Sequence, residues 1–212
     1  TGRSWKPDLT PIPIGNTLQD VLFDSHWYKG PTGVVWRWDG VIRIQAFDQY
    51  GANGALISRA FAALNSALAD TPVRLELVPV DGAVGLSIIE RERWSEFAED
   101  LDPDPNIWGW AWTYGDEEYT LYGGYILVNS KRRESERYNT LIHELFHIVA
   151  GANHASQRYD SIINQSDHSW YEFDDLGAID RQLLRFLYLY LEPGDTLEDV
   201  KTLYDAYWRD AA

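Results

Sequence analysis

The stretch His143-Glu144-Leu145-Phe146-His147 lies inside the apolar run 141–150 and has the pattern His-Glu-x-x-His. On a helix, side chains four residues apart lie one turn apart on the same face, with Cβ atoms about 5–6 Å apart. Two imidazoles placed in this way can bind one metal ion, because zinc–nitrogen bonds of about 2.0–2.1 Å hold the two nitrogens only about 3.3 Å apart. Glu144 follows the first histidine and is a candidate general base toward a water molecule on the metal.

The alternative is a helix that carries two histidines and a glutamate by chance. The neighbours Leu141, Ile142, Leu145, Phe146, Ile148 and Val149 are apolar and cover several faces of the helix. Such a helix is buried. Burial of two imidazoles and a carboxylate costs several kcal/mol unless they are paired or bind a metal. The pattern therefore favours a metal site.

The bulk composition bounds the other possibilities. The 212 residues carry a formal net charge of −15 and no cysteine. The negative charge argues against nucleic-acid binding, which needs a basic surface. The absence of cysteine excludes disulfides and thiolate metal ligands. No apolar run approaches the roughly 18 residues of a membrane-spanning helix.

The order of predicted elements indicates one α+β domain over residues 34–212. Alternating apolar residues predict a strand over 34–47, strands near 73–77 and 84–89, and a strand over 123–130 directly before the central helix. Helical spacing predicts helices over 57–68, 176–191 and 197–207. Residues 1–33 hold four of the nine prolines and are predicted to form an extended N-terminal arm, with residues 21–23 as a packing point.

The segment 107–114 is rich in tryptophan, and Trp108, Trp110 and Trp112 share one face if it is a strand. This row could line a substrate cleft, stack on sugar rings, or pack across the sheet. The acidic residues 116–118 follow it. Their carboxylates are candidate ligands for Ca²⁺, although no EF-hand pattern is present.

A catalytic zinc normally takes three protein ligands and a water, so a third ligand must be found. His154 is the first candidate, because Gly151 can turn the chain back under the helix. His168 and Glu172 are the alternatives. Gly151 is also the expected end of the central helix, and Ser130 or Ser135 is expected to cap its start.

The segment from His143 through Gly151 to His154 resembles the extended zinc motif of the metzincin clan of metalloproteases, and residues 173–188 look like the final helix of its matrixin-like bacterial members. The chain departs from that pattern in two ways. Three residues instead of two separate His147 from Gly151, and there is no methionine for the turn below the metal. Ile163 stands where that methionine is expected, as an apolar floor.

The resemblance implies a zincin-like fold: a small mixed, twisted sheet with an edge strand, a central active-site helix and a C-terminal helix. It also implies a secreted or periplasmic zinc-dependent endopeptidase acting on protein or peptide substrates. Zn²⁺ would be held by His143, His147 and His154, and Glu144 would be the general base. An aspartate at 174, 175 or 180 would lock the turn below the metal.

Within this resemblance, the substrate would lie antiparallel to the strand Tyr125–Asn129, taken as the edge strand. Tyr159 or Tyr171 is a candidate to assist at the carbonyl oxygen. The alternative function is a non-catalytic binding module on the same scaffold, which would bind peptide or glycan through the Trp-rich segment 107–114.

Overall fold

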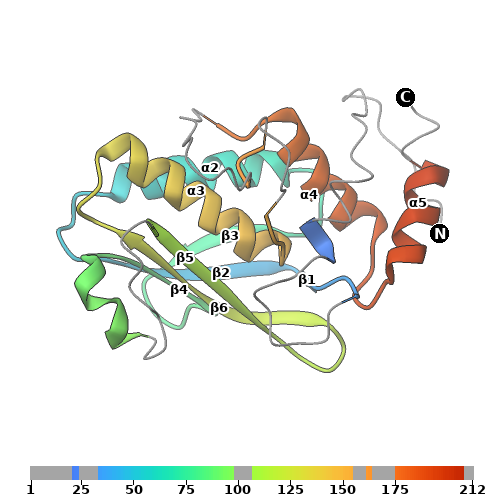
Figure 1. The fold of residues 1–212 in the computed structure, drawn as a ribbon, viewed down its shortest axis with the longest axis horizontal. Helices are drawn as coiled ribbons and strands as arrows, with labels where there is room; N and C mark the ends of the chain where they lie inside the picture. Colours follow the sequence, from blue (N-terminus) through green and yellow to red (C-terminus); the bar gives the residue numbers. More distant parts are fainter. Residues whose placement is uncertain (1–20, 24–32, 98–106, 155–160, 164–174, 208–212) are drawn as a thin grey trace.

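The computed structural model describes residues 21–23, 33–97, 107–154, 161–163 and 175–207, and its centre is one six-stranded mixed sheet (Figure 1). The strands are β1 (Arg37–Trp38), β2 (Val41–Asp48), β3 (Arg74–Val78), β4 (Val84–Ile89), β5 (Gly109–Gly115) and β6 (Thr120–Asn129). The order is β1-β6-β4-β2-β3, with parallel pairing throughout, and β5 is added to β6 in antiparallel orientation. The crossover from β2 to the parallel strand β3 is made by a helix, as such connections usually are.

Helices α2 (Gly54–Ala67), α3 (Glu134–Ala150) and α4 (Ala178–Tyr190) lie along one face of this sheet (Figure 1). Further helical elements are the 3-10 helix η1 (Arg91–Glu96) and α5 (Leu197–Tyr207). The main core lies between the sheet and α2, α3 and α4, because alternate strand residues such as Ile42, Ile44 and Leu86 point toward the apolar sides of these helices. The opposite face carries a smaller cluster around Ile89, Trp94 and Leu127, which η1 covers.

The predicted fold class is confirmed: a small mixed sheet, a central buried helix and a C-terminal helix. The predicted helices correspond to α2, α4 and α5, and the predicted strand over 84–89 is β4. The predicted strand over 34–47 is wrong in one respect, because the chain is interrupted at Gly40, which has a φ of 76°. That left-handed backbone, which favours glycine, separates β1 from β2 and lets them pair with different strands.

The prediction that Tyr125–Asn129 forms the edge of the sheet is also wrong. This part of β6 pairs with β4 on one side and with β5 on the other. The Trp-rich strand β5 stands outside it, and the described residues pair β5 with β6 alone. The sequence pattern could not show this, because a strand buried between two neighbours and a half-buried edge strand can carry similar apolar residues.

The opposite edge of the sheet, along β3, is closed by side chains. The Asn65 amide on α2 accepts a hydrogen bond from the Leu75 N–H (2.8 Å) and donates one to the Leu75 carbonyl (3.0 Å). The Thr71 hydroxyl bonds in the same way to both backbone groups of Val73, each at 3.3 Å. These contacts occupy backbone groups that could otherwise pair with another strand. The two edges of the sheet therefore differ in how open they are to an added strand.

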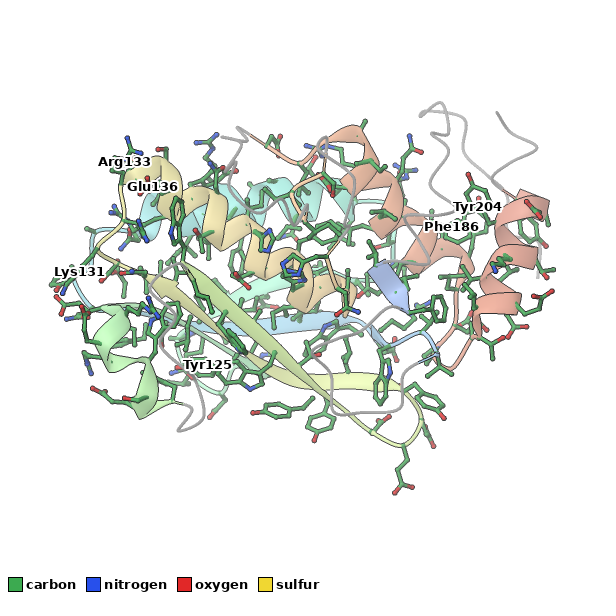
Figure 2. All side chains as sticks on the ribbon, viewed as in Figure 1. Tyr125, Lys131, Arg133, Glu136, Phe186 and Tyr204 are labelled. Atoms are coloured by element: carbon green, nitrogen blue, oxygen red, sulfur yellow. The ribbon has the colours of Figure 1, made fainter. Side chains whose placement is uncertain are left out.

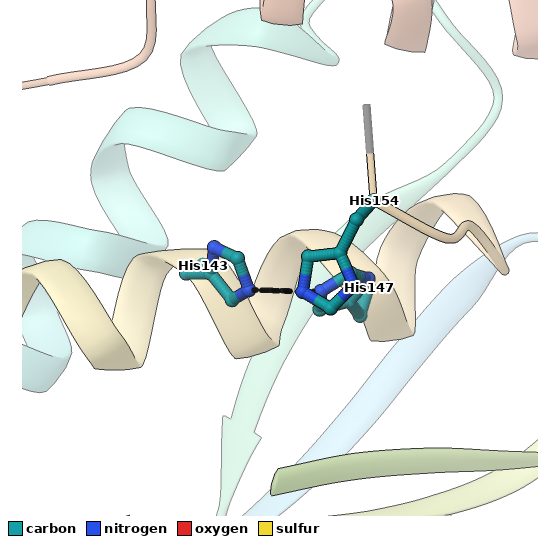
Figure 3. A group of neighbouring side chains, drawn as sticks. All are labelled: His143, His147 and His154. Carbon is teal, nitrogen blue, oxygen red and sulfur yellow. Dashed lines mark hydrogen bonds between the residues drawn. The ribbon is translucent and has the colours of Figure 1, made fainter. Parts of the chain in front are cut away.

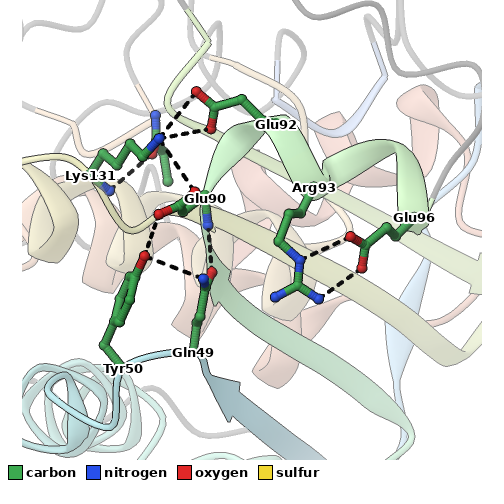
Figure 4. A network of polar contacts seen from close by, with 8 residues as sticks. Gln49, Tyr50, Glu90, Glu92, Arg93, Glu96 and Lys131 are labelled. Carbon is green, nitrogen blue, oxygen red and sulfur yellow. Dashed lines mark hydrogen bonds and ion pairs between the residues drawn. The ribbon is translucent and has the colours of Figure 1, made fainter.

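A polar network joins the carboxyl ends of three parallel strands (Figure 4). Gln49, just after β2, accepts a hydrogen bond from the Glu90 N–H at the end of β4 (3.0 Å). Lys131, just after β6, lies 3.3 Å from carboxylate oxygens of both Glu90 and Glu92. These exposed contacts add little stability one by one. They fix the connection from which α3 begins.

The N-terminal arm is described only at residues 21–23. Val21, Leu22 and Phe23 are buried in the main core, as the sequence predicted, and the Val21 carbonyl accepts a hydrogen bond from the Asn153 N–H (2.8 Å). Residues 1–20 and 24–32 lie outside the described residues. The division into an arm and a domain over 34–212 therefore stays a prediction.

Candidate metal centre

Helix α3 places the His-Glu-x-x-His pattern in the core. It begins after Arg133, whose backbone N–H donates to the Glu136 carboxylate (3.0 Å), and not at Ser130 or Ser135 as predicted. A glutamate three residues into a helix can satisfy a backbone donor in this way, so the cap did not need a serine. The helix ends at Gly151, as predicted, with a φ of 56° in the left-handed region.

The side chains of His143, His147 and His154 meet at one point (Figure 3). The Nε2 atom of His143 lies 2.9 Å from Nε2 of His147 and 3.1 Å from Nε2 of His154. These distances are close to the roughly 3.3 Å expected between two nitrogen ligands of a tetrahedral zinc ion. Among the described residues, this is the one group of three or more candidate metal ligands gathered around a common point.

Backbone carbonyls orient two of these rings. His147 Nδ1 lies 2.7 Å from the Ala152 carbonyl oxygen, and His143 Nδ1 lies 2.6 Å from the Ile162 carbonyl oxygen. A carbonyl oxygen only accepts, so each Nδ1 carries the hydrogen and each Nε2 is left with a bare lone pair. Two such Nε2 atoms at 2.9 Å cannot hydrogen bond to each other. A cation between them is what this donor set fits.

The extra residue before Gly151 is accommodated by the end of the helix. The helix continues through Ala150, and the Ala152 N–H then donates to the His147 carbonyl (3.3 Å). The same short turn brings the Ala152 carbonyl to the His147 ring and carries the chain back to His154. The longer spacing therefore still brings the third imidazole to the other two.

A tight turn at Ser161–Ile163 contacts the His143 ring through the Ile162 carbonyl, and Asp180 of α4 holds this turn. The Asp180 carboxylate accepts hydrogen bonds from the Ser161 hydroxyl (2.6 Å) and the Ile162 N–H (3.1 Å). Asp180 is fully buried, and so is Ile163. Of the three aspartates that the sequence offered for this contact, Asp175 instead pairs with Arg181 (2.8 Å) and Asp174 lies outside the described residues.

Glu144 lies in the same buried region, on the side of α3 that faces β5. Its side chain packs so closely against Gly109 that a methyl group on residue 109 would lie 2.5 Å from Glu144 Oε1. Burial raises the pKa of the Glu144 carboxyl to about 8. A carboxyl with a pKa this close to neutral can take up and release a proton at neutral pH.

Burial also keeps the three imidazoles neutral. It lowers the pKa of His143, and it lowers the pKa of His147 further, with the charges of His143 and His154 as additional causes. Burial and then the charge of His143 lower the pKa of His154 to about 3. Neutral imidazoles are the form that binds a metal ion.

Several predicted site residues cannot be placed. The alternative third ligands, His168 and Glu172, lie outside the described residues, as do Tyr159 and Tyr171. The acidic loop at 116–118 shows no calcium-like arrangement, since Asp116 Oδ1 accepts hydrogen bonds from the backbone N–H groups of Glu118 and Thr120, each at 2.9 Å. The described residues therefore give no support to the Ca²⁺ prediction.

Three functional contacts were missed by sequence reasoning. The carbonyls of Ala152 and Ile162 orient the rings, and Gly109 makes room for Glu144. Carbonyl groups carry no sequence signal, because every residue has one. The small residues at 109, 111 and 113, alternating with large aromatic ones, were a signal that β5 approaches a helix closely, and that signal was available.

The Trp-rich strand is partly explained by packing. Trp110 and Trp112 lie against the smaller cluster around Leu127, and Trp108 lies beside Arg132, whose Cζ atom is 4.2 Å from its ring centre. The expectation that these rings pack across the sheet is therefore confirmed for Trp110 and Trp112.

The chain thus combines a mixed sheet with a buried helix that carries the His-Glu-x-x-His pattern. Among solved structures, it is similar to high choriolytic enzyme 1, a hatching enzyme zinc-protease from Oryzias latipes (medaka fish), with 11% identity, 73% of this chain and 94% of that chain covered, and a TM-score of 0.40. It is also similar to myroilysin, with 11% identity, 87% and 99% covered, and a TM-score of 0.41. No protein-family profile and no curated protein sequence matches the chain. Both likenesses are distant, and the chemistry of this chain follows from its own site residues.

Within the described residues, no helix has the length and apolar character needed to cross a membrane.

Proposed function

We propose that this chain is a zinc-dependent endopeptidase in which His143, His147 and His154 hold the metal and Glu144 is the general base. The observation that carries the proposal is the convergence of three neutral imidazoles, two of them turned by backbone carbonyls so that Nε2 faces the common point. A donor set of nitrogen atoms alone, with no cysteine in the chain, suits zinc better than calcium or magnesium.

Zinc bound at such a site supplies a Lewis acid, which lowers the pKa of a water molecule toward 7 and polarises a carbonyl group. The chain supplies the proton transfer. The Glu144 carboxylate takes a proton as water attacks the peptide carbonyl, and the same carboxyl then gives that proton to the leaving amine. The balance is one water consumed for one peptide bond broken, which yields a carboxylate end and an amine end.

The buried position of Glu144 serves both parts of this transfer. Burial favours the neutral form of the Glu144 carboxyl, which helps it to accept a proton, and the resulting acid can release that proton to an amine without leaving the pocket. The Gly109 backbone against it excludes water from one side of the carboxyl group. The proton is thus kept beside the bond that is being broken.

The outer edge of β5 is the place where a peptide would bind. The Trp108 carbonyl accepts a hydrogen bond from the Asn129 N–H (3.0 Å), so residues 108, 110 and 112 direct their backbone groups toward β6. By the alternation of an antiparallel pair, Gly109 and Ala111 direct theirs away from β6. A substrate strand could bond to these groups by strand addition. We therefore propose β5 as the strand that binds the substrate, instead of the Tyr125–Asn129 strand expected from the sequence, because β5 covers that side of β6.

The test is to measure bound metal and peptidase activity in the parent protein and in Glu144→Gln. We expect about one zinc per chain in both proteins, and cleavage of an unfolded protein by the parent that falls by about two to four orders of magnitude in the variant. Glu134→Gln, an exposed change on the same helix, is the matched control and should keep full activity. A parent protein that binds no zinc, or a Glu144→Gln variant as active as the parent, would contradict the proposal.

The third ligand needs its own experiment. His154→Ala should lower zinc affinity sharply, whereas His168→Ala and Glu172→Ala should leave it nearly unchanged. Zinc affinity, measured by competition with a chromophoric chelator, separates these cases without relying on activity. Retention of full affinity in His154→Ala would assign the third position to another residue.

A further inference from the structure

We propose that the substrate residue lying opposite Trp112 is aromatic, and that its ring extends a stack of rings that already crosses the outer face of the sheet. The inference deepens the proposed function and rests on it, because it takes the substrate to be an antiparallel strand on β5. It names the class of peptide that this edge selects: an extended chain with a planar side chain at one defined position.

The stack begins at Phe97, the residue directly after η1, and runs across two strands. The rings of Phe97 and Tyr125 have centres 5.3 Å apart, at 36° to each other. The rings of Tyr125 on β6 and Trp112 on β5 have centres 5.2 Å apart and lie within 21° of parallel. Tyr125 lies on the face of the sheet away from α3 (Figure 2). The spacing of the last two rings is close to the roughly 4.8 Å between neighbouring strands.

The register explains why the rings face each other. Trp112 and Tyr125 are directly opposite in the β5–β6 ladder. The Tyr125 ring fills the space that a side chain on Gly85 of β4 would take, since a Cβ there would come within 2.2 Å of the ring, and its hydroxyl contacts the Ser87 hydroxyl at 2.7 Å. Tyr125 is therefore held in place by two residues of β4 and fixes the tilt of Trp112. The ring face of Trp112 turned away from Tyr125 points to where the next strand would lie.

A strand added to β5 would put a side chain at that position. Trp112 directs its backbone groups toward β6, so it forms a non-hydrogen-bonded pair with a residue on the added strand. Side chains come closest in such pairs, with Cα atoms about 4.5 Å apart. Aromatic pairs contribute beyond the area that they bury, equivalent to a preference of about two- to tenfold over a residue without a ring.

The neighbouring positions would not share this preference. Ala111 and Thr113 point to the other face of the sheet, toward α3, and present small side chains there. Substrate residues opposite them face the metal centre and have no ring beside them. The preference should therefore fall on one position and recur, more weakly, two residues away beside Tyr114, whose ring is half exposed.

The arrangement fits a peptide better than a sugar. Sugar binding uses an open ring face together with polar groups at its rim. The Trp112 Nε1–H already donates to the Tyr114 hydroxyl (2.6 Å), and the Tyr125 hydroxyl already bonds to Ser87. The strand edge supplies backbone donors and acceptors, which an extended peptide matches.

The test uses a set of zinc-loaded cleavage assays with peptides that differ at one position, which carries Ala, Leu or Trp. We expect kcat/KM to be about two- to tenfold higher for Trp than for Ala at one position of the peptide, the one that lies opposite Trp112. Trp112→Leu should bring this ratio close to one. Tyr122→Ala removes an exposed ring of β6 that stacks on Tyr114 instead of on Trp112, and it should keep the ratio of the parent at the Trp112 position.

Equilibrium binding of the Trp and Ala peptides to Glu144→Gln separates this inference from the proposed function. Cleavage without any aromatic preference, or a preference that Trp112→Leu leaves intact, would overturn the inference while the peptidase stands. A preference seen in binding, lost in Trp112→Leu, with no cleavage by the parent, would overturn the peptidase and retain the aromatic position. Binding of a soluble oligosaccharide that depends on Trp112, with no peptide preference, would also overturn the inference.

Discussion

Gly109 on β5 and Glu144 on α3 lie so close together that residue 109 has no room for a side chain. A Cβ atom there would lie 2.4 Å from Thr140 Cγ2, 2.5 Å from Glu144 Oε1 and 2.7 Å from Glu144 Cγ. These distances are far shorter than van der Waals contact. The lack of a side chain at Gly109 is thus what allows the candidate general base to reach the edge strand.

Gly109→Ala should therefore displace Glu144 and lower kcat by about a hundredfold, the loss expected for a misplacement of about 1 Å. Overpacking should also destabilise the protein by about 1–3 kcal/mol. Gly123→Ala on β6 is the matched control, because its Cβ would have no neighbour closer than 3.4 Å. Steady-state kinetics and urea unfolding would check both variants, and equal kcat in the two would count against a positioning role for Gly109.

Asp180→Asn should loosen the turn that contacts the His143 ring. The carboxylate accepts from Ser161, from the Ile162 N–H and from the Gly177 N–H (2.8 Å), and an amide has one acceptor atom in place of two. We expect zinc affinity to fall by about 10- to 100-fold, the range seen when an outer partner of a metal ligand is lost. The Ile162 carbonyl that orients His143 is the link between the two sites.

Asp175→Asn is the comparison for that experiment. Asp175 lies five residues before Asp180, and its carboxylate, which pairs with Arg181, is about half exposed. Exposed pairs contribute little. Competition titrations should thus give a parent-like zinc affinity for Asp175→Asn, and a similar loss in both variants would show that the effect of Asp180 is not transmitted through the turn.

The sequence predicted the parts of this structure that depend on local pattern. Helical spacing located α2, α4 and α5, and the His-Glu-x-x-His pattern with His154 pointed to the residues that the fold brings together. These succeeded because amphipathic helices and metal-ligand spacing are set by neighbours in the chain. Asp180 was recognised only as one of three candidates, since its partner turn lies 18 to 19 residues away.

The parts that failed depend on contacts between distant segments. Which strand forms the edge is decided by the pairing of β5 with β6, and the periodicity of β6 alone does not contain that information. The Gly40 break was missed because the apolar residues on both of its sides suggested one continuous strand. The requirement for Gly109 depends on α3, more than 30 residues later in the chain.

Glu144→Gln should stabilise the metal-free protein, and increasingly so as the pH rises toward 8. The folded-state pKa of about 8 is above the ordinary value of 4.5, so the folded state binds more protons than the unfolded state between these values. Stability contributed by the protonated carboxyl is therefore lost as the pH rises through this range, by up to about 1.4 kcal/mol per pH unit. Glutamine has no proton to lose and avoids this cost.

The window from pH 6.5 to 8 isolates the effect, because both proteins carry the same histidines and their titration largely cancels in the difference between the two. Urea unfolding of both proteins with a chelator present should show a stability difference that grows by about 2 kcal/mol at most across the window. Glu134→Gln, an exposed change on the same helix, controls for the exchange of a glutamate for a glutamine in α3. A difference between Glu144→Gln and the parent that stays constant with pH would indicate that Glu144 is ionised throughout.

Asn65→Ala should open the β3 edge of the sheet. The Asn65 amide bonds to both backbone groups of Leu75 in place of a neighbouring strand, while Leu77 on the same strand is half exposed. An open, apolar strand edge is a template for pairing with another chain. We expect the variant to remain folded but to form dimers or larger species at concentrations where the parent is monomeric, as measured by light scattering.

Ser66→Ala, an exposed change next to Asn65 on α2, controls for the gain in helix propensity and should not alter the association state. Equal association of the two variants would show that the edge is closed by something other than Asn65.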